Sequence, residues 1–392
     1  MLPLLRAGAL TPELRATFFH VTVFFGNAVG AVAFAIWLAS KSIPTDQIGI
    51  INAVPMLLML GANLFIGRLA DRADDWRTTI VIIALLGFGV SLGLFFVNEF
   101  WGVLLVWALC GLTAGSVPPL IDAATLRMTQ RNGSDFGSIR AWGTVGYMTM
   151  SVAAGFFAAT YGASVFVPLY VLSALIRGAV SLQLPRFRAP AHLAVPVAAN
   201  LASNRLREVL RPWFVLPLVA WGLIQITHSV LALFAALIWK EKGISEAAIG
   251  PLIATGAAAE AVMMFIWRRI GLTLSARQML LVAALAASVR WAITAADPPL
   301  AMLFLLQLLH ALTYSVGYFG CMHFIAKWTG EDIAAEAQGF AVVVQQAMTV
   351  IGMLVFGYLA QAYGIRAFLF PALCGLLAAG CILVSLRLHP SH

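Results

Sequence analysis

Residues 16–40, ATFFHVTVFFGNAVGAVAFAIWLAS, contain no aspartate, glutamate, lysine or arginine. A helix needs about 20 mainly apolar residues to cross the hydrocarbon layer of a membrane, so this stretch is long enough to span one. The rest of the chain has the same character: of 392 residues, 61% are apolar and 10% are charged, and the mean hydropathy is +0.93. Soluble domains carry roughly 25% charged residues. Lipid must therefore solvate most of this protein.

Twelve such stretches follow one another along the sequence. Their length, and their lack of alternating polar and apolar residues, exclude a β-barrel. The sequence therefore predicts an all-α polytopic membrane protein with twelve transmembrane helices. The expected spans are 16–40, 46–67, 78–97, 100–122, 139–160, 164–184, 212–238, 247–267, 278–295, 299–325, 338–361 and 365–386.

Basic residues concentrate in one set of loops. With the N-terminus in the cytoplasm, eighteen of the 24 lysines and arginines fall in cytoplasmic segments, four on the opposite side, and two, Arg177 and Arg290, inside spans. Cytoplasmic loops of membrane proteins carry such an excess, so we expect both termini in the cytoplasm. The net charge of +8 then reflects topology, and we expect no nucleic acid partner.

The longest connection, 185–211, contains three prolines and divides the spans into two groups of six. The predicted domains are an N-terminal six-helix half (1–184), this cytoplasmic linker and a C-terminal six-helix half (212–392). The loops GRLADRADDWRTTI, from Gly67, and WRRIGLTLSARQML, from Trp267, look like copies of a distant repeat. Two pseudo-symmetric halves around a central cavity are typical of transporters, whose substrate site lies near mid-membrane.

Four ionisable side chains inside the spans stand out: Asp122, Glu260, Arg290 and His310. Arg140 opens the fifth span and is a possible partner for Asp122. Ionisable groups are costly in hydrocarbon, so each of these residues is a functional candidate. The alternative is that they form structural ion pairs that join helices.

Further candidates lie on the same helix faces or beside them: Tyr147 with Arg140, Tyr314 with His310, and also His228 and Asn27. Asn27 lies in the motif Gly-Asn-Ala-Val-Gly, which favours close helix packing or a substrate contact. The four cysteines lie in apolar runs without Cys-x-x-Cys spacing, and we interpret them as small buried hydrophobes. We expect no metal, no cofactor and no cleaved signal peptide.

The loop Gly67-Arg68-Leu69-Ala70-Asp71-Arg72 resembles the signature of the major facilitator superfamily. The resemblance implies a gating role for Asp71 and Arg72. An acid there can face the positive end of a helix dipole and hold the cytoplasmic side shut. The alternative for this pair is a solvated loop charge. Asp74 and Asp75 depart from the family pattern, which has glycine and a basic residue there.

A closer resemblance lies in Pro118–Tyr147 and Glu260–Thr313, which are similar to the phenylpropionate permease branch and, more remotely, to the lactose permease. It implies a substrate site at Asp122, Arg140 and Tyr147, with a second set at Glu260, Arg290 and His310, beside which we place Tyr314, His228 and Asn27. The lactose permease carries its proton on a glutamate three residues after the histidine, where this chain has Thr313. We therefore expect proton coupling at Glu260, Asp122 or His310.

These features together predict a major facilitator transporter that works by alternating access. We expect proton-coupled uptake of a small organic solute, an aromatic or other carboxylate or a small glycoside, by a monomer in a bacterial inner membrane. An efflux antiporter or a facilitator would use the same fold. A polytopic membrane enzyme is the alternative from another class, but the sequence contains no His-Glu-x-x-His metal motif.

Overall fold

The computed structural model describes residues 10–187, 211–270, 274–329 and 334–388. Within these ranges helices are the only regular secondary structure, and each of the twelve predicted spans coincides with one helical segment. Nine stretches of the described chain are long and apolar enough to cross a membrane, and the last of them, Phe340–Leu388, covers two successive helices. The predicted all-α multi-pass fold is confirmed.

The first six segments are formed by the following elements in chain order. They are α1 (Pro12–Val23), α2 (Phe25–Val29), the π-helical turn η1 (Gly30–Phe34) and α3 (Ala35–Ser40) in the first span; α4 (Thr45–Arg72); α5 (Trp76–Ser91) with the short η2 (Leu92–Phe95); α6 (Phe100–Asn132); α7 (Phe136–Tyr161); and η3 (Ala163–Val165) with α8 (Phe166–Ser181).

The second six segments repeat this plan. They are α10 (Pro212–Val230), the π-helical turn η5 (Leu231–Ala235) and α11 (Ala236–Glu241); α12 (Glu246–Ile270); α13 (Ala276–Ala295); α14 (Leu300–Leu308), the π-helical turn η6 (Ala311–Val316) and α15 (Gly317–Trp328); α16 (Ala334–Tyr363); and η7 (Gly364–Phe368) with α17 (Leu369–Leu388).

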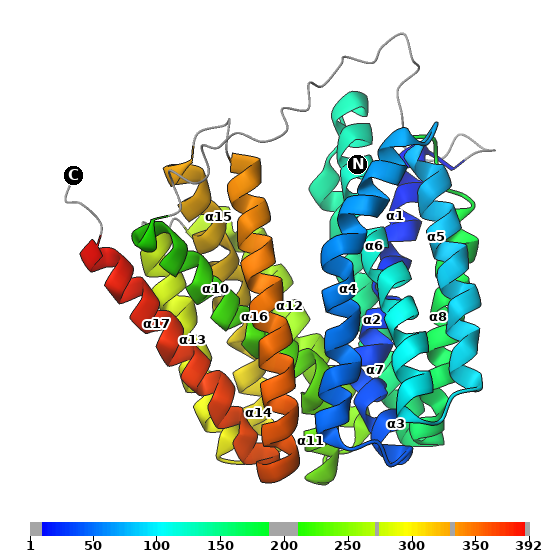
Figure 1. Ribbon diagram of the computed structural model, residues 1–392. Helices are drawn as coiled ribbons and strands as arrows, with labels where there is room; N and C mark the ends of the chain where they lie inside the picture. The colour runs from blue at the N-terminus through cyan, green and yellow to red at the C-terminus, as the bar shows by residue number, and fades with distance from the viewer. Residues whose placement is uncertain (1–9, 188–210, 271–273, 330–333, 389–392) are drawn as a thin grey trace.

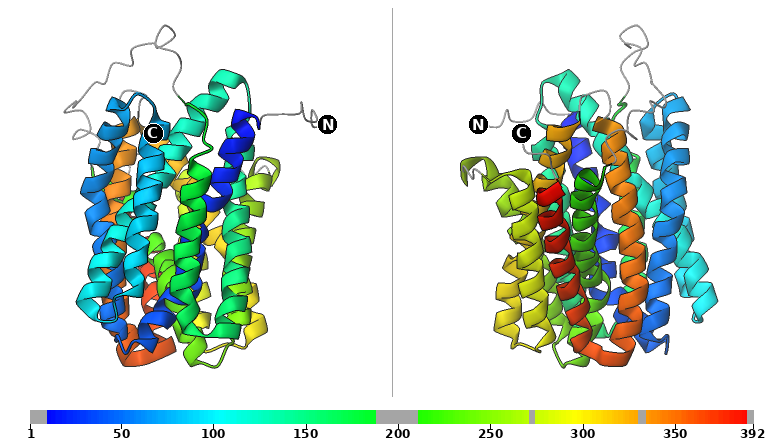
Figure 2. Two further views of the ribbon diagram at one scale, coloured as in Figure 1. Left: turned by 90° about the vertical axis from the view of Figure 1, so that its right-hand side faces the viewer. Right: turned by 60° about the vertical axis from the view of Figure 1, so that its left-hand side comes forward.

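The helices form two groups. Figure 1 shows α1–α8 on one side and α10–α17 on the other, and the views in Figure 2 show both groups running along a common axis. The start of α1 and the end of α17 lie at the same end of the molecule (Figure 1). The grouping agrees with two six-helix halves. The domain boundaries themselves stay a prediction, because residues 188–210 of the linker lie outside the described residues.

Side chains of the sequence fix several helix starts. The carboxylate of Asp75 accepts the backbone N–H of Arg77 at 2.8 Å where α5 begins, and that of Asp135 accepts the N–H of Ser138 at 2.7 Å where α7 begins. Ser275 opens α13 with a reciprocal capping box to Gln278. Such caps satisfy N–H groups that a helix cannot satisfy internally. The start of α7 matters most, because Arg140 follows one turn later.

Glycines bring the two halves into backbone contact at the end of the molecule opposite the termini. A Cβ atom at Gly155 in α7 would collide with the backbone of Gly250 in α12, and one at Gly49 in α4 would collide with the backbone of Met353 in α16. At the same end the backbone N–H of Thr45 donates to the side-chain oxygen of Gln361 at 2.7 Å. These contacts hold the halves together there.

The glycine contact predicts a specific sensitivity to side-chain size. Gly250→Val should lower the thermal unfolding midpoint of the purified protein by several degrees, because overpacking of a tight contact costs about 1–3 kcal/mol. Gly380→Val is the matched control, since a Cβ atom at Gly380 meets no other atom within 4 Å. Equal midpoints for the two variants in a thermal melt would contradict the contact.

Candidate functional site

A cavity of about 310 Å³ lies where the two halves meet in the middle of the molecule. It has the size of a small-molecule site, for which about 300–1,000 Å³ is usual. Its walls come from both halves. The lining residues are Phe24, Arg140, Thr144, Tyr147, His228, Leu231, Ala232, Ile253, Gly256, Ala257, Glu260, His310 and Tyr314. Two more predicted site residues, Asp122 and Arg290, contact residues of this lining, and six line the cavity directly: Arg140, Tyr147, His228, Glu260, His310 and Tyr314.

Interrupted helices shape this cavity. The π-helical turns η1, η5 and η6 occur within three of the spans, one in the N-terminal half and two in the C-terminal half. A π-helical turn carries an extra residue and rotates the following side chains, and such turns are frequent at functional sites. Leu231 and Ala232 of η5 and Tyr314 of η6 face the cavity as a result.

The predicted pair of Asp122 and Arg140 forms in the N-terminal half. The Nε of Arg140 lies 3.1 Å and 3.3 Å from the two carboxylate oxygens of Asp122, and both side chains are about one-third exposed. The guanidinium lies over the ring of Phe24, 4.8 Å from its centroid. Asp122 does not line the cavity, but it contacts Arg140, which does. Only the Nε edge of Arg140 is used by Asp122.

His20 completes this cluster from α1. Its ring is fully buried, with Nε2 3.1 Å from the hydroxyl of Thr125 and Nδ1 3.9 Å from Asp122. The ring is packed between helices. It also lies within ionic reach of the carboxylate of Asp122 if it is protonated.

In the C-terminal half, His310 stands between Arg290 and Glu260. Nη1 of Arg290 lies 3.3 Å from Nδ1 of His310, and Nε2 of His310 lies 3.2 Å from the carboxylate of Glu260. Arginine can only donate, so Nδ1 must accept and the ring proton sits on Nε2, from which it is donated to Glu260. His310 thus connects Arg290 to Glu260, with Nδ1 facing the arginine and Nε2 facing the carboxylate.

Arg290 itself does not reach the cavity. It is 1% exposed, donates to the side-chain oxygen of Gln307, and lies 3.5 Å from the hydroxyl of Thr313. The resemblance to the lactose permease implied that Arg290 belongs to the substrate site. In the structure Arg290 contacts His310, which lines the cavity. Arg140 is the guanidinium that lines the cavity, and it lies within Coulombic range of Glu260 from the opposite half.

The rings of histidine and tyrosine side chains form the rest of the polar lining of this cavity. The ring centroids of His228 and His310 are 4.6 Å apart and nearly perpendicular, while those of His310 and Tyr314 are 5.6 Å apart and nearly parallel. Tyr147 faces them from α7. These rings offer both faces for stacking and polar edges for hydrogen bonds.

A second cavity of about 460 Å³ adjoins the first, since Tyr147 and Ala232 line both. Asn27 belongs to this second cavity rather than to the charged one. The lining residues are Gly26, Asn27, Gly30, Ala31, Phe34, Asn52, Pro55, Met56, Met59, Trp107, Gly111, Ala114, Gly115, Tyr147, Tyr170, Ala232, Leu233 and Met353.

Asp71 and Arg72 lie in the last turn of α4. Their side chains are outside the described part of the chain, so their gating role stays a prediction.

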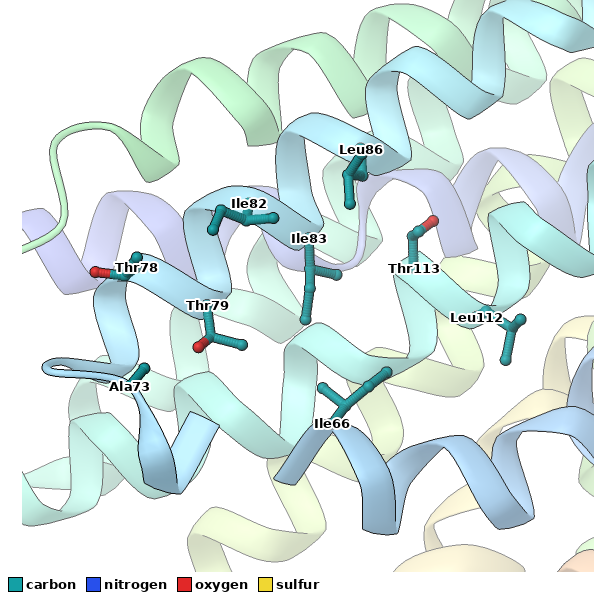
Figure 3. Close-up of a pocket in the computed structure, with 9 residues that line it drawn as sticks. All are labelled: Ile66, Ala73, Thr78, Thr79, Ile82, Ile83, Leu86, Leu112 and Thr113. Carbon is teal, nitrogen blue, oxygen red and sulfur yellow. The ribbon is translucent and has the colours of Figure 1, made fainter. Parts of the chain in front are cut away.

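A groove between α4, α5 and α6 is a poor candidate for the solute site (Figure 3). It has a volume of about 460 Å³ and is lined by Ile66, Ala73, Thr78, Thr79, Ile82, Ile83, Leu86, Leu112 and Thr113. None of these side chains is charged, and Ile82 and Leu86 are more than half exposed on the outer face. The groove therefore faces lipid.

Sequence reasoning missed several residues of the two cavities. Phe24, Trp107 and Tyr170 read as ordinary apolar residues of a span, and no spacing distinguishes them. Arg177 was placed in a span without a role. It is 5% exposed and lies near Cys110 and Tyr170, and Tyr170 lines the second cavity. Of these residues, only Arg177 could have been identified as a functional candidate from the sequence, because a charged side chain inside a span is costly.

Comparison with known proteins gives a consistent picture. The model of the MFS_1 like family matches residues 15–371. The chain is 27% identical over 376 residues to the probable 3-phenylpropionic acid transporter of Escherichia coli (strain K12), covering 91% of this chain and 93% of that protein. It is 25% identical over 377 residues to the maltose permease of Geobacillus stearothermophilus, covering 94% and 93%.

Solved structures show the same fold at lower identity. The nucleoside transporter NupG matches with a TM-score of 0.80 and 15% identity, over 97% of this chain and 100% of that one. A D-xylose-proton symporter matches with a TM-score of 0.73 and 13% identity, over 96% and 97%. The predicted resemblance to the phenylpropionate permease branch and the major facilitator fold are both confirmed.

The Asp122–Arg140 pair predicts coupled effects on stability. Asp122→Asn and Arg140→Gln should each lower the free energy of unfolding, and the double variant should lose less than the sum of the two losses. Because both side chains are about one-third exposed, we expect a coupling of roughly 1 kcal/mol or less. A double-mutant cycle measured by chemical unfolding in detergent tests this, and strictly additive losses would show that the two groups do not interact.

Proposed function

The chain belongs to the MFS_1 like family, whose relatives are membrane transporters rather than enzymes, and we propose that it imports a small organic acid together with a proton. It is a multi-pass transporter of a small molecule. The proposed substrate is a carboxylate with an apolar body, moved by a monomer in a bacterial inner membrane. The following features support this proposal.

The balance of charge around the two cavities is the main observation. In the described part of the chain five charged side chains line or back them: Arg140, Arg177, Arg290, Asp122 and Glu260. With both acids ionised, one positive charge is left without a counterpart. An uncompensated charge held away from water is costly, and a bound monoanion offsets that cost. The charge balance therefore favours an anionic substrate.

Arg140 is the natural place for the carboxylate. Asp122 contacts its Nε, and the Arg140 side chain lines the cavity, so its terminal nitrogens can bind a substrate. A guanidinium binds a carboxylate through short charge-assisted hydrogen bonds. Tyr147, on the same face of α7, and Tyr314, across the cavity, can complete the site with ring faces or hydroxyl groups.

Glu260 is the favoured proton carrier. Asp122 contacts a guanidinium directly, whereas the partner of Glu260 is the ring N–H of His310. Protonation of Glu260 therefore breaks no ion pair with arginine, and its carbonyl oxygen can still accept from His310. A substrate carboxylate arriving at Arg140 would weaken the attraction between Arg140 and Glu260, which favours the proton on Glu260. Binding of acid and proton would thus assist each other.

The glycine contacts support alternating access. They join the halves at the end opposite the termini, so we infer that this conformation is accessible from the end that carries the termini. The distribution of basic residues assigns that end to the cytoplasm. Separation of the halves at the glycine contacts would expose the cavity to the other side.

A small glycoside is the second candidate. A maltose permease is 25% identical to this chain, and an arginine–carboxylate pair beside aromatic rings suits sugar hydroxyls as well. Competition between 3-phenylpropionate and maltose for the purified protein separates the two classes. An antiporter or a facilitator differs in its response to a gradient, which the next experiment measures.

Replacing Glu260 tests the coupling. Purified protein in liposomes with an inward proton gradient should accumulate 3-phenylpropionate. Glu260→Gln should still exchange labelled for unlabelled substrate but lose accumulation, because the amide mimics the protonated acid permanently. Glu99→Gln, at an exposed glutamate, should behave as wild type. Accumulation by Glu260→Gln would move the carrier to Asp122, and a wild type indifferent to the gradient would exclude symport.

Arg290 should be sensitive even to a conservative change. Lysine lacks the planar fork that contacts His310 and Gln307 together, so Arg290→Lys should release His310 and reduce the initial rate of uptake at least ten-fold. The control is Arg366→Lys, at an exposed position outside the cavities. Uptake at the wild-type rate in Arg290→Lys, with normal protein insertion, would remove Arg290 from the mechanism.

A further inference from the structure

We propose that the second cavity binds the aromatic end of the transported acid, while the charged cavity holds its carboxylate. This inference rests on the proposed function and names the shape of its substrate. It assigns a role to Phe34, Trp107 and Tyr170, which neither motif nor charge distinguishes, and to Gly30 of the Gly-Asn-Ala-Val-Gly motif.

The two cavities are neighbours. Tyr147 and Ala232 line both, so a molecule bound at Arg140 can extend past Tyr147 into the second cavity. Space is sufficient, because an apolar cavity of about 150 Å³ already holds benzene and this one has about 460 Å³. A small acid that lacks an apolar group would leave the second cavity unoccupied.

The walls suit a flat aromatic ring. The rings of Phe34 and Trp107 stack with centroids 3.7 Å apart, and Tyr170 lies 5.1 Å from Trp107. Aromatic groups prefer such neighbours in offset or tilted arrangements at 4.5–7 Å. Methionines Met56 and Met59 add polarisable sulfur, which also favours aromatic partners.

The polar groups of the second cavity are few. The hydroxyl of Tyr170 lies near the thiol of Cys110, and the amide of Asn52 donates to the carbonyl of Ile48 at 2.9 Å. Both polar groups therefore have neighbours within the protein. Asn27 has an exposed side chain among the lining residues. No lining residue carries a charge, so the carboxylate belongs at Arg140 and the apolar end belongs here.

Gly30 is a suitable position at which to test this assignment by substitution. A Cβ atom there would meet only Trp107, at 3.9 Å, so a larger side chain would fill the cavity without displacing the protein. Gly26 is less suitable, because its Cβ atom would lie 3.3 Å from Tyr170. Gly30 lies in η1, away from Arg140 and Glu260 in the chain, and lines only the second cavity.

The experiment compares Gly30→Val with Gly89→Val, a lipid-exposed glycine whose Cβ atom meets nothing within 4 Å. Uptake into liposomes is measured for 3-phenylpropionate and for propionate, which lacks the ring. Wild type and Gly89→Val should prefer 3-phenylpropionate by at least ten-fold in apparent affinity. Gly30→Val should lose about ten-fold or more for 3-phenylpropionate and keep its affinity for propionate.

Three outcomes would overturn the inference. Equal affinities of Gly30→Val and Gly89→Val for 3-phenylpropionate would show that the ring lies elsewhere. A wild type that takes up both acids equally would preserve the proposed function but exclude a ring site. A wild type that takes up neither acid would reject the proposed function itself. If Gly30→Val does not fold, Ala114→Leu fills the same cavity from α6, and the same comparison decides.

Discussion

The contact between Arg290 and His310 governs the chemistry of the C-terminal half. A guanidinium buried to 1% exposure must find acceptors, and it finds them in His310 and Gln307. Because arginine only donates, it fixes which ring nitrogen of His310 carries the proton and therefore which one faces Glu260. In the N-terminal half the guanidinium of Arg140 instead has a carboxylate, that of Asp122, as its direct acceptor. The halves share an architecture, but their acids have different partners: an arginine for Asp122 and a histidine for Glu260.

Most of the fold was predictable from the sequence, for a physical reason. In hydrocarbon every backbone N–H and C=O must be satisfied within its own helix, so a long apolar stretch allows one secondary structure. Each predicted span coincides with a helical segment. The ends differ: α6 continues to Asn132, ten residues beyond the predicted 122, because its last turns leave the apolar layer and no longer need apolar residues.

The site was predictable only in part. Rare ionisable residues in apolar spans identified Asp122, Glu260 and His310, since their burial is costly enough to be informative. The place of Arg290 behind His310 was not predictable, because it depends on how α13 packs against the tenth span. The second cavity was not predictable for the same reason: glycines and aromatic residues of η1, α6 and α8 form it only once the helices meet.

The glycine contacts between the halves have an energetic consequence. At that end the described residues join α7 to α12 and α4 to α16 through close backbone packing and the hydrogen bond from Thr45 to Gln361, without a buried ion pair across the crossing. Separating the helices at these glycine contacts loses van der Waals contact but leaves no buried charge without a partner. The two conformations can then lie close in free energy, and a ligand that prefers one of them ten-fold shifts the equilibrium by about 1.4 kcal/mol. Contacts of this kind suit the alternating access that we propose for this protein.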